Sequence, residues 1–197
     1  MTAMQMTVFS TPILTPFLRF LALMGLKLSG WQVQGDIAAV HRVQKAVLIG
    51  APHTSNWDFI VMLAVMLACR LDVHWMGKHT LFPWPLAGFM RWLGGISIDR
   101  RQAHNTVSEM VDVFKKTQHL VVIIPPEGTR KKVERWKTGF YHIAHGAGVP
   151  IILGFLNYPA KSAGFAGEFY PTGDIESDLP KIQAFYADKI GKNPHHL

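Results

Sequence analysis

His53 and Asp58 are the two residues of this chain whose types and spacing are best suited to chemistry. They lie five positions apart, between a strand-like and a helix-like apolar segment. A carboxylate at this spacing can hold an imidazole by one ring nitrogen and leave the other nitrogen to take a proton, a role that the pKa of histidine suits near neutral pH. The alternative is a turn histidine beside helix-capping residues, because Ser55, Asn56 and Asp58 are all good N-cap types.

Glu127, Gly128, Thr129 and Arg130 form a second polar group, directly after the apolar run Leu120–Ile124 and two prolines. A strand that stops at such residues puts the group on a turn at the end of a sheet, where ligands usually bind in open α/β proteins. Gly128 allows close backbone approach, Thr129 offers a hydroxyl, and Arg130 can hold a phosphate with two parallel donors. The alternative is a solvated basic loop, because more lysines and arginines follow.

Two further cations follow strand-like segments. Lys78 comes just after Leu71–Met76, and Arg100 comes just after Gly95–Asp99. The carboxyl ends of parallel strands lie at the same edge of a sheet, so we expect Lys78, Arg100 and Arg130 to converge on an anion beside His53.

Strand-length apolar runs alternate with helix-like segments, which predicts a single α/β domain with a central, mostly parallel β-sheet flanked by helices. The expected strands are Ala46–Ala51, Leu71–Met76, Gly95–Asp99, Leu120–Ile124 and Pro150–Leu156, with Gly164–Tyr170 as a further strand near one edge. The expected helices are Phe59–Cys69, Ala103–Thr117, Lys137–His145 and Leu179–Ile190. The order of the strands stays open.

The composition of the chain limits the classes of partner that can be expected. The 197 residues suit one domain, and 49% hydrophobic against 17% charged residues suggests a surface that does not face water everywhere. A net charge of +7 favours anionic partners. Nucleic acid is not expected, because no helix has a dense basic face and no binding motif is present. Cys69 is the only cysteine, so an internal disulfide is impossible and a reducing compartment is the natural setting.

Residues 1–30 are expected to form a membrane-interface segment, and residues 31–197 the main domain. Thr15–Leu28 is apolar and helix-like, but prolines and the cations Arg19 and Lys27 interrupt the stretch, so a membrane span is not expected. A helix lying in the headgroup region, with both cations reaching the interface, fits this pattern. The alternative is a helix packed on the domain's own core.

These motifs resemble those of the glycerolipid acyltransferases, the lysophosphatidic acid acyltransferase-like family. The first family motif, His-x-x-x-x-Asp, is matched by His53 and Asp58. The other three are matched in family order by Gly95–Arg100, Pro126–Arg130 and Gly148–Leu153, so that the resemblance covers roughly Lys45 to Leu156. Ser97 and Pro125 stand where the family more often has bulky apolar residues, which could reshape the acceptor pocket and leaves the identity of the acceptor open.

The resemblance implies transfer of a fatty acyl group from acyl-CoA or acyl carrier protein to a hydroxyl of a lyso-phospholipid such as lysophosphatidic acid. His53 would be the general base and Asp58 its orienting partner. The same comparison implies that Glu127 holds the acceptor or neighbouring cations, and that the acceptor's phosphate is bound by Lys78, Arg100 and the turn from Gly128 to Arg130. No cofactor is implied beyond the acyl donor. The expected location is the cytoplasmic face of the cell membrane, as a peripheral or monotopic protein.

Other functions stay open. The acceptor could be a non-glycerol lyso-lipid such as a lyso-ornithine lipid, the protein could bind membranes without catalysis, or water could replace the acceptor in a thioesterase or lipid hydrolase. A metal site is not expected: His142 and His145 lie three positions apart, but no Cys/His cluster supplies further ligands.

Overall fold

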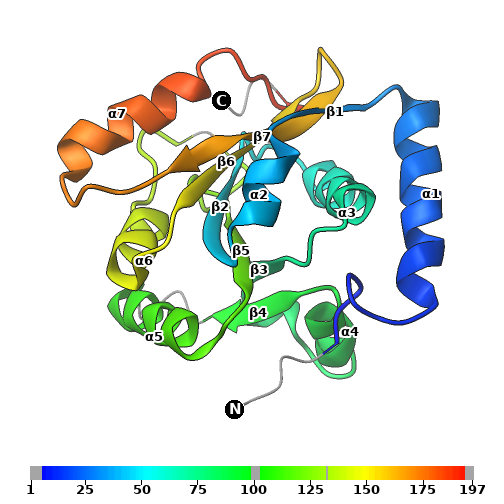
Figure 1. The fold of residues 1–197 in the computed structure, drawn as a ribbon, viewed down its shortest axis with the longest axis horizontal. Helices are drawn as coiled ribbons and strands as arrows, with labels where there is room; N and C mark the ends of the chain where they lie inside the picture. Colours follow the sequence, from blue (N-terminus) through cyan, green and yellow to red (C-terminus); the bar gives the residue numbers. More distant parts are fainter. Residues whose placement is uncertain (1–5, 99–102, 132, 194–197) are drawn as a thin grey trace.

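The computed structural model describes residues 6–98, 103–131 and 133–193. Within these residues, seven strands form one sheet in the order β1-β7-β6-β2-β5-β3-β4, with helices on both faces (Figure 1). The strands are β1 (Gln32–Gly35), β2 (Lys45–Ala51), β3 (His74–Lys78), β4 (Gly95–Ile98), β5 (Leu120–Ile124), β6 (Ile151–Asn157) and β7 (Ser162–Phe169). This is the mostly parallel α/β fold that the sequence predicts.

The five strands from β6 to β4 are parallel, so their carboxyl ends lie at one edge of the sheet. β7 reverses direction and pairs antiparallel with β6, and β1 pairs parallel with β7 at the edge of the sheet. The reversal follows from the short connection between β6 and β7, because parallel neighbours would need a long crossover.

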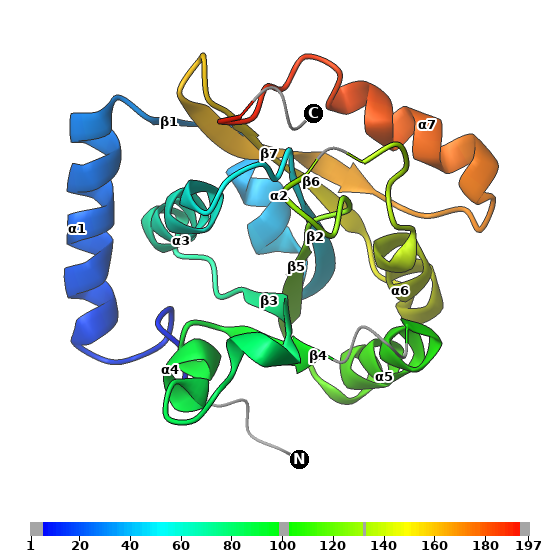
Figure 2. The same ribbon diagram turned by 180° about the vertical axis from the view of Figure 1, so that it is seen from behind.

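The helices lie in two layers, which Figures 1 and 2 show from opposite sides. One face of the sheet is covered by α5 (Ala103–Lys116), α6 (Gly139–Ala147) and α7 (Ile175–Phe185). The other face carries α2 (Ile37–Arg42), α3 (Trp57–Cys69) and α4 (Ala87–Trp92), with the short 3-10 helix η1 (His79–Leu81) before α4. α1 (Leu14–Ser29) packs along the outer side of α3.

Alternate residues of each central strand build two separate cores, because successive side chains of a strand point to opposite faces. In β2, Val47 and Ile49 pack toward α5, α6 and α7, whereas Ala46 and Leu48 pack toward α2 and α3. All four are buried. A strand that is apolar on both faces is typical of a covered parallel sheet.

Most predicted elements are confirmed, with shifted ends. β3 runs from His74 to Lys78 instead of from Leu71 to Met76, and Lys78 is therefore the last residue of the strand. β1, α2, η1 and α4 were not predicted. α7 begins at Ile175 and ends at Phe185, earlier than the predicted Leu179–Ile190, because the Asp174 side chain accepts a hydrogen bond from the Ser177 amide and caps the helix at that point.

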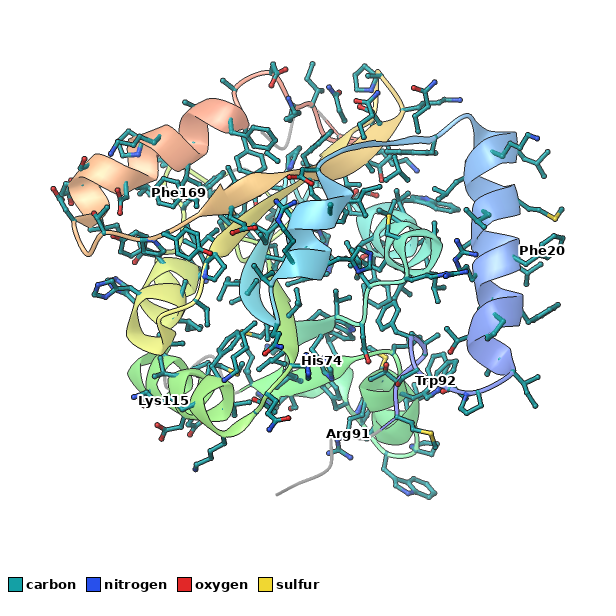
Figure 3. All side chains as sticks on the ribbon, in the orientation of Figure 1. Phe20, His74, Arg91, Trp92, Lys115 and Phe169 are labelled. Atoms are coloured by element: carbon teal, nitrogen blue, oxygen red, sulfur yellow. The ribbon has the colours of Figure 1, made fainter. Side chains whose placement is uncertain are left out.

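α1 has one buried face and one exposed apolar face. Ala22 and Leu26 are buried, whereas Phe17, Phe20 and Met24 are exposed. Phe20 projects away from the rest of the molecule in Figure 3. Arg19 differs from the prediction, because its Nε donates a hydrogen bond to the Ala68 carbonyl oxygen near the end of α3 (3.3 Å) instead of reaching outward. None of the described helices is long and apolar enough to cross a membrane.

Candidate active site

The His53 side chain lies on the loop that joins β2 to α3, at the carboxyl edge of the sheet. Its Nδ1 is 3.2 Å from Oδ2 of Asp58, which belongs to the first turn of α3. The His53 side chain is 26% exposed and that of Asp58 is 5% exposed, so the imidazole is accessible and the carboxylate is not. With Nδ1 engaged, Nε2 is the ring nitrogen that can take a proton.

The Asp58 carboxylate is held by donors from two parts of the chain. Oδ2 also accepts hydrogen bonds from the amides of Thr54 (2.7 Å) and Ser55 (2.8 Å). Oδ1 accepts one from the hydroxyl of Tyr158 (2.8 Å), which follows β6. Burial raises the pKa of Asp58, but the bonds from His53, Ser55, Tyr158 and Thr54 together outweigh burial, and the net pKa is lowered. Asp58 is therefore ionised at neutral pH.

Glu127 lies behind the loop and not in the cavity wall. It is 9% exposed, and its Oε1 accepts a hydrogen bond from the His53 backbone amide (3.1 Å). Among the described residues, its buried Oε2 has no hydrogen-bond partner. Burial raises the pKa of this carboxyl, and the hydrogen bonds from its own amide and from the His53 amide only partly offset that effect.

The turn after β5 is built around Gly128, whose φ of +63° is the left-handed conformation that glycine adopts readily. A Cβ at this position would lie 2.9 Å from Cδ of Lys137, which packs against the turn. The Gly128 amide donates to the Pro125 carbonyl oxygen (3.1 Å), and the Thr129 hydroxyl accepts from the Lys131 amide (3.3 Å). The predicted turn is therefore present, and a further cation lies against it.

A cavity of about 600 Å³ opens beside His53 between the sheet and α3. Its polar wall comes from loops and strand ends and includes His53, Asp58, Lys78, Gly128, Thr129 and Arg130. The rest of the wall is apolar and lies deeper along the strands and α3; it includes Leu48, Met62, Met66, Trp75, Ile123 and Phe165. A charged head and a long apolar tail would fit these two parts.

The structure thus brings together most of the predicted site. Lys78 and Arg130 share the cavity with His53, as expected from the parallel strand ends. Arg100 lies outside the described residues. Tyr158 was missed, although it lies two positions after the predicted strand Pro150–Leu156, where the rule that selected Lys78 applies equally. In the described part of the chain, no cluster of His, Cys, Asp and Glu is arranged to hold a metal ion.

Residues 32–152 match the family model described as Acyltransferase. The match covers more than half of the chain, and the chain belongs to the acyltransferase family. The 1-acyl-sn-glycerol-3-phosphate acyltransferase of Escherichia coli (strain K12) is 37% identical over 109 residues, or 52% of this chain and 43% of that protein. The protein of the same name from Haemophilus influenzae (strain ATCC 51907 / DSM 11121 / KW20 / Rd) is 33% identical over 118 residues, or 56% and 47%. The match therefore spans about half the length of these relatives.

A solved structure supports the fold independently. The 1-acyl-sn-glycerophosphate (LPA) acyltransferase PlsC from Thermotoga maritima superposes with a TM-score of 0.58 at 16% identity, covering 87% of this chain and 76% of that chain. The resemblance inferred from the four motifs is thereby confirmed at the level of family and fold.

Proposed function

We propose that this protein is an O-acyltransferase that moves a fatty acyl group from an acyl thioester to a hydroxyl of a lyso-phospholipid, with lysophosphatidic acid as the favoured acceptor. One observation carries the proposal: the His53–Asp58 pair lies beside Lys78 and Arg130 at the polar wall of an otherwise apolar cavity. The arrangement offers a base, an anion site and space for an acyl chain in one place. The relatives named above support the reaction class.

In the proposed reaction, Nε2 of His53 takes the proton of the acceptor hydroxyl, and the hydroxyl oxygen attacks the thioester carbonyl carbon. The tetrahedral intermediate then collapses, the C–S bond breaks, and the protonated imidazole returns its proton to the departing thiolate. Asp58 holds the ring and balances its positive charge. No covalent acyl-enzyme is needed, and Cys69, the sole cysteine, does not line the cavity.

Lys78 and Arg130 are proposed to bind the acceptor's phosphate, with Arg100 added on the strength of the family resemblance. Thr129 and the backbone at Gly128 complete that wall. Glu127 supports the His53 loop through the backbone amide; the role implied for it by the resemblance, holding the acceptor or neighbouring cations, stays a prediction. The amide of Gly128 is already bonded to Pro125, so oxyanion stabilisation is assigned to other backbone donors of the turn. No cofactor is proposed beyond acyl-CoA or acyl carrier protein.

An anionic membrane surface is the proposed site of action, on the cytoplasmic face and without a span. α1 exposes Phe17, Phe20, Leu21, Met24 and Leu28. A second exposed apolar group lies at and before α4 and consists of Leu81, Trp84, Leu86 and Phe89. α4 and α1 lie on the same side of the sheet in Figures 1 and 2. Hydrogen bonds join the segment before α1 to the end of α4. Nε1 of Trp92 donates to the Thr11 hydroxyl (2.9 Å), and the Val8 amide donates to the Trp92 carbonyl oxygen (2.7 Å). Exposed apolar faces of this kind, on a protein of charge +7, suit an interfacial protein.

Acyl transfer in a defined system tests the proposal. Labelled acyl-CoA or acyl carrier protein is mixed with lysophosphatidic acid in vesicles, and products are compared for the wild type, His53→Ala and the control His119→Ala. His119 is an exposed histidine before β5, at the opposite edge of the sheet. Labelled phosphatidic acid from the wild type and the control, but not from His53→Ala, is the expected result.

The other outcomes each identify an alternative. Free fatty acid without acylated lipid would mean a hydrolase, and turnover only with a lyso-ornithine lipid would mean a different acceptor. No turnover with any donor and acceptor would favour a membrane-binding protein without catalysis. Full activity in His53→Ala would contradict the assignment of the base.

A further inference from the structure

The two carboxylate oxygens of Asp58 have different hydrogen-bond partners. Oδ2 accepts three hydrogen bonds, all from its own loop: the amides of Thr54 and Ser55 and Nδ1 of His53. Oδ1 accepts one, from a residue 100 positions away, the hydroxyl of Tyr158 at 2.8 Å. A carboxylate can rotate about the bond that joins it to Cβ, and such rotation would take Oδ2 away from His53. The Tyr158 hydroxyl opposes that rotation from the other side.

Tyr158 is itself held in place from two directions. Its backbone amide donates to the Ile190 carbonyl oxygen (2.9 Å), and its ring lies edge-on to that of Trp31, with centroids 5.0 Å apart. Trp31 follows α1 and is fixed by a bond from its amide to the Leu26 carbonyl oxygen (2.8 Å). The phenol is thus anchored by backbone and ring, so its hydroxyl reaches Asp58 from a defined point.

The same carboxy-terminal segment that holds Tyr158 also holds the loop of His53. The Asn193 amide donates to the Thr54 hydroxyl (3.2 Å), and its Nδ2 donates to the Thr54 carbonyl oxygen (2.9 Å). At Gly191, a Cβ would lie 2.4 Å from Oγ1 of Thr54, so only glycine fits the contact. Thr54 is 2% exposed beneath this segment. Residues 190–193 therefore hold both Tyr158 and the His53 loop in place.

We propose that Tyr158 is a positioning residue of the active site, which acts through Asp58 to hold the His53 imidazole in the orientation needed for proton transfer. This inference rests on the proposed acyltransferase function. It assigns to Tyr158 no contact with substrate; the hydroxyl fixes the carboxylate, and the carboxylate fixes the ring.

Tyr158→Phe removes the hydroxyl and keeps the ring against Trp31, which makes it the sharp test. We expect kcat to fall about ten- to one-hundredfold, as it does when a metal-binding side chain loses the hydrogen-bond partner that orients it. The KM for lysophosphatidic acid should change little, because Tyr158 does not bind the acceptor. Tyr170→Phe is the matched control, since its hydroxyl bonds Glu168 on the surface (2.9 Å).

The pH profile separates positioning from general support of the fold. The groups that face Asp58 are His53, Tyr158 and, more remotely, Glu127. Loss of the Tyr158 bond removes one of the interactions that lower the pKa of Asp58, so this pKa rises. The proton that limits kcat at low pH belongs to the hydrogen-bonded pair of His53 and Asp58, so a more basic carboxylate moves the acidic limb of kcat to higher pH. Asn193→Ala loosens the loop without touching the carboxylate, so it should lower the melting temperature and leave the limb in place. Partial unfolding would reduce the amplitude of the profile, not shift the limb, and circular dichroism across the pH range measures it.

Each result decides something. If the wild type transfers no acyl group, the proposed function fails, whatever Tyr158 does. If the wild type is active and Tyr158→Phe keeps both its kcat and its acidic limb, the proposed function stands and the positioning role is wrong. If kcat falls without a shift of the limb, and Asn193→Ala behaves alike, Tyr158 is only structural and the positioning role is again wrong.

Discussion

The backbone amide of His53 donates a hydrogen bond to the carboxylate of Glu127, 74 positions later in the chain, at 3.1 Å. This bond joins the loop after β2 to the turn after β5, which are neighbouring strands of the sheet. The proposed base and the proposed anion-binding turn are thus joined by a hydrogen bond, and a change in the turn should alter the position of His53.

Glu127→Gln should raise the free energy of unfolding at pH 7. Because the folded pKa of Glu127 is raised above its unfolded value, ionisation favours the unfolded state in full above the folded pKa; the penalty shrinks as the pH falls below the folded pKa and is absent below the unfolded pKa. The gain from glutamine should therefore shrink toward pH 4. Urea unfolding at several pH values measures it, with the exposed Glu134→Gln as control. An unchanged stability at pH 7 would mean that the Glu127 charge is compensated.

Lys78→Ala and Arg130→Ala should each reduce kcat/KM for lysophosphatidic acid about ten- to one-hundredfold, since a hydrogen bond to a charged group contributes about 1.5–3 kcal/mol. The loss should appear mainly in KM, because a phosphate is gripped in the ground state and the transition state alike. Arg135→Ala, at an exposed position outside the cavity wall, is the control.

A neutral acceptor sharpens that experiment. With a monoacylglycerol, which has no phosphate, the two variants should match the wild type. Equal losses with the charged and the neutral acceptor would show that these cations do not bind the phosphate.

Replacing Phe17, Phe20 and Met24 by serine should weaken binding to anionic liposomes at least about tenfold, because each buried apolar side chain contributes about 1.5–3 kcal/mol. These side chains are exposed, so the melting temperature should change little. Val113→Ser, on α5, is the control for an exposed apolar residue elsewhere. Vesicle co-sedimentation supplies the measurement, and undiminished binding would remove α1 from the membrane surface. Deleting α1 is a poorer test, because it would uncover α3.

Gly164→Ala should destabilise the edge of the sheet by about 1–3 kcal/mol, the usual cost of overpacking. A Cβ at Gly164 would lie 1.8 Å from the Gln34 carbonyl oxygen, so β1 would have to move away from β7. Gly167→Ala in the same strand is the matched control, because a Cβ there meets nothing within 4 Å. Faster hydrogen exchange in residues 32–35 for the first variant alone would confirm the cause; equal stability of both would contradict it.

The sequence predicts those parts of the fold whose pattern is local. Leu120–Ile124 reads as a buried strand because every residue is apolar, and β5 has these bounds. β1 could not be predicted, because Gln32 and Gln34 break any apolar pattern and its stability comes from pairing with β7. β3 was placed too early, because Leu71 and Val73 are buried in a loop, which periodicity does not distinguish from a strand.

The site divides in the same way. His53, Asp58 and the turn at Gly128 carry signals within a few residues, and the parallel strand ends bring Lys78 to them. The contacts of Tyr158 with Asp58 and of Asn193 with Thr54 join residues 100 and 139 positions apart. Such contacts depend on how distant parts of the chain fold together, which no short motif indicates. Only the folded structure reveals them.

The exposed face of α1 bears on how the concentration of the proposed acceptor should be expressed. If this face rests on a bilayer, as proposed, the protein meets lipids in two dimensions, and the quantity that governs its rate is the mole fraction of lyso-lipid in the surface. Diluting the vesicles with buffer would then leave the velocity of the bound protein unchanged, whereas diluting the lyso-lipid with inert lipid would lower it. A Michaelis constant quoted in bulk molarity would describe the preparation of vesicles more than the affinity of the cavity.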